Sequence, residues 1–168
     1  KAPEDWKNAL EIGEMGMAPW GELEVSGPEG WGQEAPAPVM RKTFQIGEGL
    51  ERAELSVCGL GYYELVMNGG RVGDRELDPA FTRYDKRALY STYDVTDRLK
   101  QGANAMALTL GNGWYNMHTR AEWDFDQAPW RDRPQAILQM DLFYKDGRKE
   151  SVVTDGSWKG STGPIVLD

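Results

Sequence analysis

The sequence is poor in the residues on which many catalytic sites depend. It contains one cysteine and one histidine in 168 residues. A single cysteine cannot form an internal disulfide, and Cys58 ends an alternating apolar stretch, so we expect a small buried side chain rather than a nucleophile. Cytoplasm and periplasm both tolerate such a thiol, which leaves the compartment open. His118 has no serine or cysteine in a known nucleophile pattern, and we interpret it as polar loop surface.

Positive charge and long hydrophobic runs are also scarce. Lysine and arginine number 19 against 27 aspartates and glutamates, a net charge of −8. Binding to a nucleic-acid backbone needs clustered basic residues that release counterions, so nucleic acid is excluded as a partner. No apolar run reaches the length needed to cross a bilayer, and Lys1 does not open a signal peptide, so membrane insertion is not expected.

Sustained helical periodicity is absent, whereas alternation of apolar and polar residues is common. Hydrophobic residues make up 40% of the chain, enough for a core. Period-two alternation predicts strands, bounded by turn residues, at 41–46, 53–57, 62–67, 88–95, 104–110, 136–144 and 148–154. We therefore predict an all-β fold, an antiparallel β-sandwich or jelly roll of the galactose-binding-like kind, with loops gathered at its ends.

Local turn signals support this assignment. Asn68, Gly69 and Gly70 tolerate positive φ and predict a tight hairpin after the strand at 62–67. A second hairpin is predicted at 145–147. Asp94 is expected to cap a single helical turn, with Leu99 folded inward.

The N-terminal part differs in composition from the rest. Prolines and glycines leave little room for a regular element up to residue 31, and residues 34–38 read EAPAP. We therefore divide the chain into an irregular interdomain arm, residues 1–38, and a β-sandwich domain, residues 39–168.

Two strings carry a resemblance to a known family. Residues 78–97 read DPAFTRYDKRALYSTYDVTD and residues 110–116 read LGNGWYN. Together they resemble the N-terminal β-sandwich domain of bacterial α-L-rhamnosidases. The resemblance implies that the PWG string at 19–21 and the SWK string at 157–159 continue into further domains of a longer polypeptide. It also implies that the catalytic carboxylates lie in a separate α/α barrel.

One candidate site is a long loop after residue 110. Aromatic rings can cover the apolar face of a pyranose while amides bond its hydroxyl groups. The candidate sugar-binding residues there are Asn112, Trp114, Tyr115 and Asn116. The alternative is structural: Trp114 and Tyr115 close the end of the sandwich, and Trp123 and Trp130 pack on a neighbouring domain.

The other candidate site is the loop at 78–87, with Phe81, Arg83, Tyr84 and Asp85 as candidate sugar-binding residues. Some sandwiches of the resembling family bind rhamnose, in certain members through calcium. Many relatives in that family carry a tryptophan where this chain has Phe81, which keeps an aromatic surface but lacks the indole N–H donor. Alternating charges on such a turn are otherwise a solvated face with local ion pairs.

No cofactor is required by any motif. Calcium needs six to eight oxygen ligands, and no EF-hand spacing occurs, so its only candidate ligands are Asn112, Asp124 and Asp126. The glycine pairs at 59 and 61 and at 111 and 113 open no helix and do not indicate a dinucleotide site.

Three hypotheses follow for function. The first is a non-catalytic accessory domain of an α-L-rhamnosidase that recognises rhamnose-containing glycans or holds other domains of the same polypeptide in place. The second is a purely structural interdomain module without a ligand. The third, independent hydrolase activity, is the weakest, because an abundance of acidic residues is no evidence for a catalytic pair.

Overall fold

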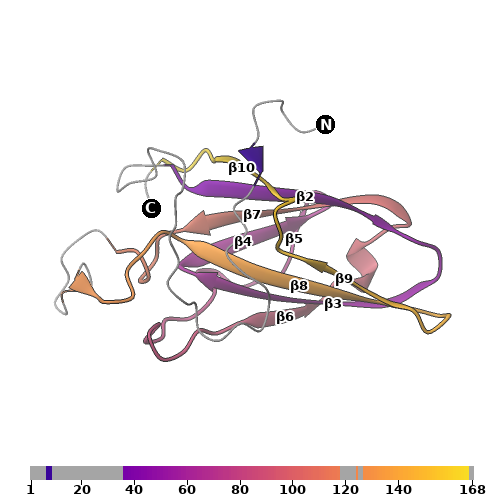
Figure 1. Ribbon diagram of the computed structural model, residues 1–168, viewed down its shortest axis with the longest axis horizontal. Coiled ribbons are helices and arrows are strands. Elements are labelled where there is room, and N and C mark those ends of the chain that lie inside the picture. The colour runs from indigo at the N-terminus through magenta and orange to yellow at the C-terminus, as the bar shows by residue number, and fades with distance from the viewer. Residues whose placement is uncertain (1–6, 9–35, 118–123, 125–126, 167–168) are drawn as a thin grey trace.

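The structure, a computed structural model, describes residues 7–8, 36–117, 124 and 127–166. Its strands form two sheets in which every pairing is antiparallel (Figure 1). The all-β sandwich prediction is therefore confirmed. The described part contains one short 3-10 turn, η1 (Thr96–Arg98), and no helix long and apolar enough to span a membrane.

The larger sheet has six strands, in the spatial order β1 (Lys7–Asn8), β10 (Lys159–Thr162), β2 (Pro38–Ile46), β7 (Gly102–Gly111), β4 (Tyr62–Met67) and β5 (Gly70–Arg71). The smaller sheet has four, in the order β6 (Ser91–Asp94), β3 (Leu50–Leu60), β8 (Gln135–Tyr144) and β9 (Lys149–Val153). Most of the predicted arm, residues 1–38, lies outside the described residues. Within it, β1 pairs with β10.

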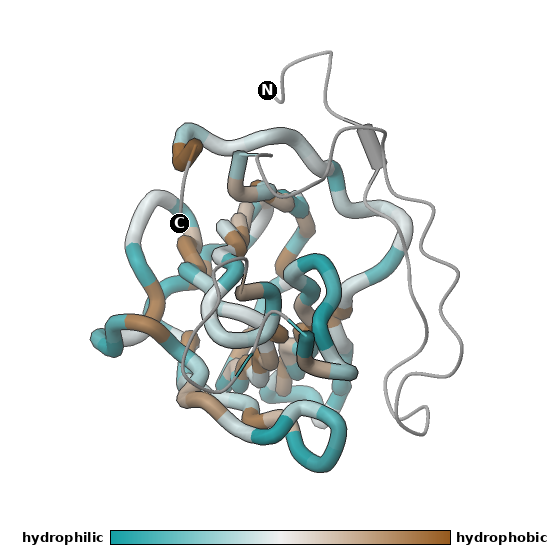
Figure 2. The backbone as a smooth tube through the Cα atoms, turned by 90° about the vertical axis from the view of Figure 1, so that its left-hand side faces the viewer, coloured by the Kyte–Doolittle hydropathy of each residue, from teal (hydrophilic) through white to brown (hydrophobic). Residues whose placement is uncertain are grey.

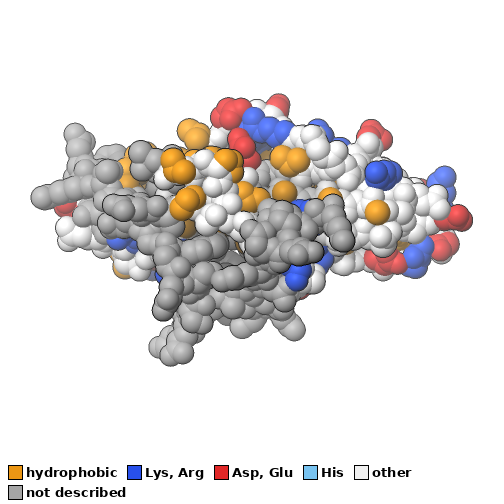
Figure 3. Space-filling view, turned by 90° about the horizontal axis from the view of Figure 1, so that it is seen from above, with side chains coloured by type: hydrophobic (Ala, Val, Ile, Leu, Met, Phe, Trp, Pro, Cys, Tyr) orange, Lys and Arg blue, Asp and Glu red, His pale blue; other side chains and the backbone are white. Residues whose placement is uncertain are grey.

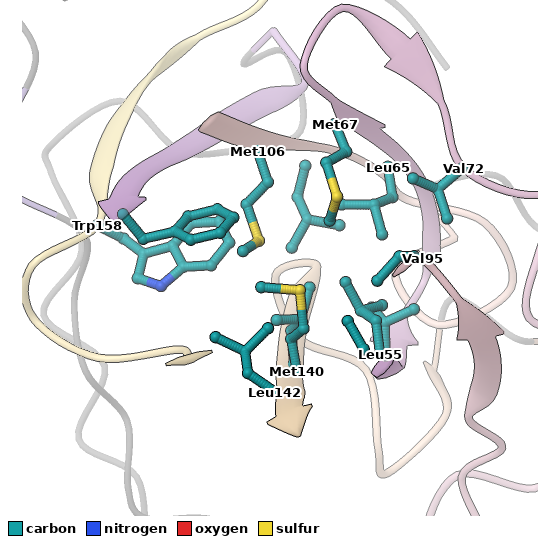
Figure 4. Packing of buried hydrophobic residues seen from close by; sticks show 14 of the residues in the cluster. Leu55, Leu65, Met67, Val72, Val95, Met106, Met140, Leu142 and Trp158 are labelled. Carbon is teal, nitrogen blue, oxygen red and sulfur yellow. The ribbon is translucent and has the colours of Figure 1, made fainter. Parts of the chain in front are cut away.

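The core lies between the sheets and consists of the alternate residues that the sequence pattern selects. Ala53, Leu55 and Val57 of β3 are fully buried, as the alternation predicts. Side chains from both sheets point toward one another in Figure 4, with Met106 and Met67 facing Met140 and Leu55. The two hydrophobic layers thus exclude water from each other, which is the main force holding a sandwich together.

Trp158 is a core residue that the alternation pattern does not reveal. Its side chain is 1% exposed and packs at one end of the core (Figure 4). The indole Nε1 donates a hydrogen bond to the carbonyl oxygen of Val153 at 2.9 Å. A buried indole needs such a partner, so the loop before β10 is held against the core.

The predicted turns are confirmed in the backbone geometry. Asn68 and Gly69 adopt φ values of 49° and 86° between β4 and β5. The single turn η1 is present, but its N-cap is Val95 and not Asp94 as predicted. The Asp94 carboxylate, one residue earlier, accepts a hydrogen bond from the Thr96 backbone N–H at 2.9 Å. Leu99 then packs against the core cluster, as predicted.

The strand expected at 88–95 is shorter than predicted. Only Ser91–Asp94 pair with β3, while Leu89 and Tyr90 are exposed. These two residues are apolar, so the sequence pattern predicted that the strand includes them, but their side chains do not enter the core. Conversely, β2 begins at Pro38, three residues before its predicted start, because proline is tolerated as the first residue of a strand.

Charged side chains of both signs are interspersed on the surface. On the face seen in Figure 3, hydrophobic side chains gather in the middle beside residues that are not described. Exposed ion pairs such as Arg52 with Glu54 at 2.8 Å and Arg148 with Glu150 at 2.6 Å are typical of a solvated sheet face. Each such pair contributes at most about 1 kcal/mol to stability.

Candidate functional site

Both candidate loops lie at the same end of the sandwich. One connects β5 to β6 and the other connects β7 to β8; they lie at the left in Figure 1 and face the viewer in Figure 2. The loops are separated in sequence by β6, η1 and β7. The sandwich brings them together because β4, which precedes the first loop, pairs with β7, which precedes the second.

Aromatic rings from the two loops contact one another. Phe81 lies 6.0 Å from Trp114 and 5.9 Å from Tyr84, measured between ring centroids. Tyr84 in turn lies 5.2 Å from Tyr115 and 6.2 Å from Trp130. We call these five residues, Phe81, Tyr84, Trp114, Tyr115 and Trp130, the aromatic cluster. Edge-to-face and tilted geometries at these distances are favourable for aromatic pairs.

The cluster has a buried base and an accessible side. Tyr115 is 6% exposed, whereas Phe81 is 44% exposed and Trp114 is half-buried. A ring that packs against a buried ring and is exposed on its other side offers a surface on which the flat apolar face of a ligand can stack. Phe81 is therefore the most accessible ring of the cluster, and Trp114, half-buried like Tyr84 and Trp130, lies next to it.

Tyr84 is the central ring of the cluster. Its hydroxyl oxygen is buried and, among the described residues, makes no hydrogen bond. Burial, together with the nearby Tyr62 and Cys58, raises the pKa of Tyr84 to about 12. The hydroxyl stays protonated at neutral pH and remains a hydrogen-bond donor at the bottom of the cluster.

The polar candidates on the first loop pair with each other. The guanidinium of Arg83 donates to both carboxylate oxygens of Asp85, at 2.8 and 3.0 Å. Both residues are exposed. They lie on the turn that carries Tyr84, and this bidentate pair stiffens that turn.

The polar candidates on the second loop also interact with each other. Asn116 is 9% exposed, and its side-chain Nδ2 donates to Asn112 Oδ1 at 2.7 Å. The Asn116 backbone N–H also donates to the Asn112 carbonyl oxygen, at 3.1 Å. The two amides thus close the turn that presents Trp114 and Tyr115.

The candidate calcium ligands are only partly within the described residues. Asp124 is exposed and has a φ of 49°. Asp126 lies outside the described residues, as do His118 and Trp123. The described residues contain no group of three or more histidine, cysteine, aspartate or glutamate side chains suited to a metal. Calcium binding therefore stays a prediction.

Asp78, the first residue of the loop at 78–87, is a buried charged residue that was not among the predicted sugar-binding residues. Its Oδ2 accepts hydrogen bonds from Tyr63 Oη at 2.8 Å, Ser91 Oγ at 2.8 Å and Tyr93 Oη at 3.0 Å. Tyr63 belongs to β4 in the large sheet, whereas Ser91 and Tyr93 belong to β6 in the small sheet. This Asp78 network therefore joins the two sheets and anchors the first candidate loop.

The network keeps Asp78 ionised. Burial opposes ionisation, but hydrogen bonds from Ser91, Tyr63 and Tyr93 outweigh it and hold the pKa of Asp78 below its usual range. Burial and the adjacent carboxylate raise the pKa of Tyr63. Arg75 adds a longer contact to Asp78, at 3.9 Å. Ser91 and Tyr93 have the two-residue spacing of one strand face, but no sequence pattern links them to Asp78 and Tyr63.

Comparison with known proteins identifies the family. Residues 48–168 match the model of the α-L-rhamnosidase N-terminal domain. The chain belongs to this family. This chain is 40% identical over 136 residues to an α-L-rhamnosidase of Formosa agariphila and 37% identical over 154 residues to one of Streptomyces avermitilis. These alignments cover 79% and 89% of this chain, respectively.

Solved structures agree with this assignment. The Streptomyces avermitilis α-L-rhamnosidase complexed with L-rhamnose superimposes with a TM-score of 0.73 at 36% identity, covering 80% of this chain and 13% of that chain. The α-L-rhamnosidase of Aspergillus terreus gives 0.72 at 38% identity, covering 79% and 15%. A lectin of Pleurotus ostreatus shares the fold, with a TM-score of 0.50 at 22% identity over 80% of this chain and 34% of the lectin.

The chain spans 14% of the length of each of these two curated relatives. What those enzymes do as whole proteins therefore does not transfer to this domain directly. The resemblance seen in the DPAFTRYDKR and LGNGWYN strings is confirmed at the level of the domain family.

Proposed function

We propose that this domain is a non-catalytic accessory domain of an α-L-rhamnosidase and that its aromatic cluster recognises rhamnose-containing glycans. The observation that carries the proposal is the convergence of Phe81 and Trp114, from separate loops, at a ring-centroid distance of 6.0 Å. A pyranose has an apolar C–H face that stacks on such rings. Support also comes from family membership and from the solved relative that was complexed with L-rhamnose.

In this proposal the residues have separate roles. Phe81 and Trp114 provide the stacking surface, and Tyr84 packs against the Phe81 ring. The Arg83–Asp85 pair and the Asn112–Asn116 pair lie on the same two turns and supply polar groups near the rim. The sugar hydroxyls would form hydrogen bonds with these polar groups, and those bonds would set the orientation of the sugar on the rings.

Isothermal titration of the 168-residue chain with L-rhamnose tests the proposal. We expect binding with a dissociation constant at or below about 1 mM, or about −4 kcal/mol. Trp114→Ala and Phe81→Ala should each weaken binding about tenfold, which corresponds to about 1.4 kcal/mol. Tyr90→Ala is the matched control, since Tyr90 is an aromatic side chain 70% exposed outside the cluster, and it should bind as wild type.

Calcium is part of the same proposal and has its own measurement. Titrations in the presence of calcium and of a chelator compare the two states directly. Tighter binding with calcium, lost in Asp124→Ala, supports an ion near the second loop. Equal affinity in both conditions removes calcium from the proposal while leaving the stacking surface in place.

Two outcomes contradict the proposal, the first its sugar recognition and the second its non-catalytic role. If no rhamnoside binds and the variants do not differ, the structural alternative, an interdomain module without a ligand, is favoured. If the 168-residue chain hydrolyses an aryl rhamnoside at a rate that survives repurification, the domain is catalytic, and the proposal that catalysis belongs to another part of the enzyme is wrong.

A further inference from the structure

We infer that Leu77, Leu89 and Tyr90 form a docking surface for another domain of an α-L-rhamnosidase polypeptide. The inference rests on the proposed accessory role, and it names where the domain meets its neighbour. Leu77 is 69% exposed, Leu89 39% and Tyr90 70%. All three lie on the loop between β5 and β6. Large apolar side chains that are exposed together mark interaction surfaces more often than solvated loops.

The Asp78 network brings the two ends of this loop together. Leu77 directly precedes Asp78, and Tyr90 directly precedes Ser91; the Asp78 carboxylate and the Ser91 hydroxyl are 2.8 Å apart. Leu77 and Tyr90 therefore lie near each other at the base of the loop, on the side of the sandwich where β5 and β6 are edge strands. The docking surface is defined by tertiary contacts although its residues are separated in sequence.

The docking surface is distinct from the aromatic cluster. Phe81 and Tyr84 lie farther along the same loop, where the Arg83 carbonyl accepts from the Lys86 and Arg87 backbone N–H groups, both at 2.9 Å. That closed turn faces the second candidate loop through the ring contacts of Tyr84. One loop thus offers a stacking surface at its turn and an apolar surface at its base.

Leu77 is held outward by a backbone conformation that leucine rarely adopts. Its φ is 52°, in the left-handed region where a side chain is disfavoured. On one side Asp78 is fixed by its carbonyl oxygen, which accepts from the Tyr63 N–H at 3.0 Å. On the other, the carbonyl oxygen of Arg75 accepts from Arg71 Nη2 at 2.6 Å. The fold holds an exposed leucine in place against its local preference.

Charge next to the surface indicates the chemistry of its partner. Arg71, Arg75 and Arg83 are each in an ion pair. The exposed side chains of Lys86 and Arg87, by contrast, have no ion-pair partner within the described part of the chain. Two exposed basic residues directly before Ala88 and Leu89, on a chain with a net charge of −8, fit a partner with an apolar patch beside acidic residues.

The partner that fits is a neighbouring domain of the same polypeptide. The matched α-L-rhamnosidases have most of their length outside the aligned region, because this chain covers only 14% of each. A sandwich within such a polypeptide has neighbours tethered to it, and tethering makes even a small interface effective. Interdomain interfaces are more polar than permanent subunit interfaces, which agrees with the mixed apolar and basic character here.

Hydrogen–deuterium exchange tests the inference without any substitution. The 168-residue chain is compared with an α-L-rhamnosidase polypeptide that carries it. We expect exchange of the backbone amides of residues 84–90 to slow at least about tenfold in the longer polypeptide, because the docked domain restricts opening of the loop to solvent. The turn at 145–148, at the opposite end of the sandwich, is the internal control and should not change. Equal exchange of residues 84–90 in both proteins overturns the inference.

Leu77→Asn and Tyr90→Ser then test the named residues. Asparagine tolerates positive φ, so the first substitution removes the apolar side chain and keeps the backbone. Each variant should restore fast exchange in the longer polypeptide while leaving the melting temperature and rhamnose titration of the 168-residue chain unchanged. Val66→Ser, at a 37% exposed valine outside the surface, should have no effect.

The sugar and docking proposals fail separately. Phe81→Ala should weaken rhamnose binding without changing exchange of residues 84–90. If Phe81→Ala also releases the loop, or if Leu77→Asn lowers the melting temperature of the isolated chain by more than a few degrees, the docking surface as defined is wrong. Absence of rhamnose binding contradicts only the sugar proposal.

Discussion

The Asp78 carboxylate connects the two sheets at an edge of the sandwich. Tyr63 Oη and Tyr93 Oη, from opposite sheets, are 3.1 Å apart and both bond to Asp78 Oδ2. Buried hydrogen-bond networks of this kind contribute more than single pairs, because losing one member leaves the others unsatisfied. At the scale of a residue, the hydrogen bonds of Asp78 fix the position at which the loop at 78–87 leaves the sandwich.

Replacing Asp78 should therefore cost stability. We expect Asp78→Ala to lower the free energy of unfolding by about 2 to 4 kcal/mol, since three hydroxyls lose their acceptor. Asp78→Asn retains one acceptor oxygen and should cost about half as much. Urea denaturation followed by tryptophan fluorescence measures both. Asp74→Ala, at an exposed aspartate of the same loop, is the control, and an equal loss in that variant would contradict the role of the network.

At the scale of elements, one residue carries the chain from the small sheet to the large one. Gly61 alone separates β3 from β4, with a φ of 97°. A Cβ atom there would lie 2.2 Å from the Gly111 carbonyl oxygen. Glycine is required for two reasons, the left-handed backbone and the close approach of β7. This corner brings β4 beside β7, and with it the two candidate loops.

A pair of glycine substitutions separates these two reasons. Gly102 has a φ of 85°, but a Cβ atom there meets nothing within 4 Å. We expect Gly102→Ala to cost about 1 kcal/mol from backbone strain alone, and Gly61→Ala to cost more than about 3 kcal/mol because strain and collision add. Thermal unfolding monitored by circular dichroism compares them. Similar losses in the two variants would show that the approach of β7 is not rigid.

At the scale of the whole molecule, acid stability depends on aspartates whose hydrogen bonds form only in the folded state. In Asp78, Asp141 and Asp155, burial opposes ionisation but hydrogen bonds outweigh it, and the pKa of each is lowered. Hydrogen bonds from Thr96 lower the pKa of Asp94. The unfolded chain therefore binds more protons than the folded chain at acidic pH, and stability rises with pH in that range.

The melting temperature should fall steeply on acidification. The stabilisation is present above the unfolded aspartate pKa of about 3.9 and is lost as the pH falls through the lower folded values. A series of thermal melts from pH 7 to pH 2.5 should thus show its largest drop below about pH 4. The drop should be smaller in Asp155→Asn, in which the charged contact with Lys42 at 2.6 Å is lost at every pH. A melting temperature independent of pH below 4 would refute this account.

The sequence by itself determined the elements and the family. Alternation at β3, β7 and β8 predicts which side chains face the core, because a strand has a period of two wherever it lies. The positive φ tolerance of Asn68 and Gly69 predicts the hairpin for an equally local reason. The DPAFTRYDKR and LGNGWYN strings predict the α-L-rhamnosidase domain family, which the comparison confirms.

Only the tertiary structure decided how distant residues meet. The ring contact between Phe81 and Trp114, the bonds of Asp78 to both sheets, and the exposure of Leu89 and Tyr90 depend on strand order. Alternation does not encode that order, since it states which face of a strand is apolar and not which strand lies beside it. Pairing is set by the packing of the complete core, and the candidate site forms where that packing brings two loop ends together.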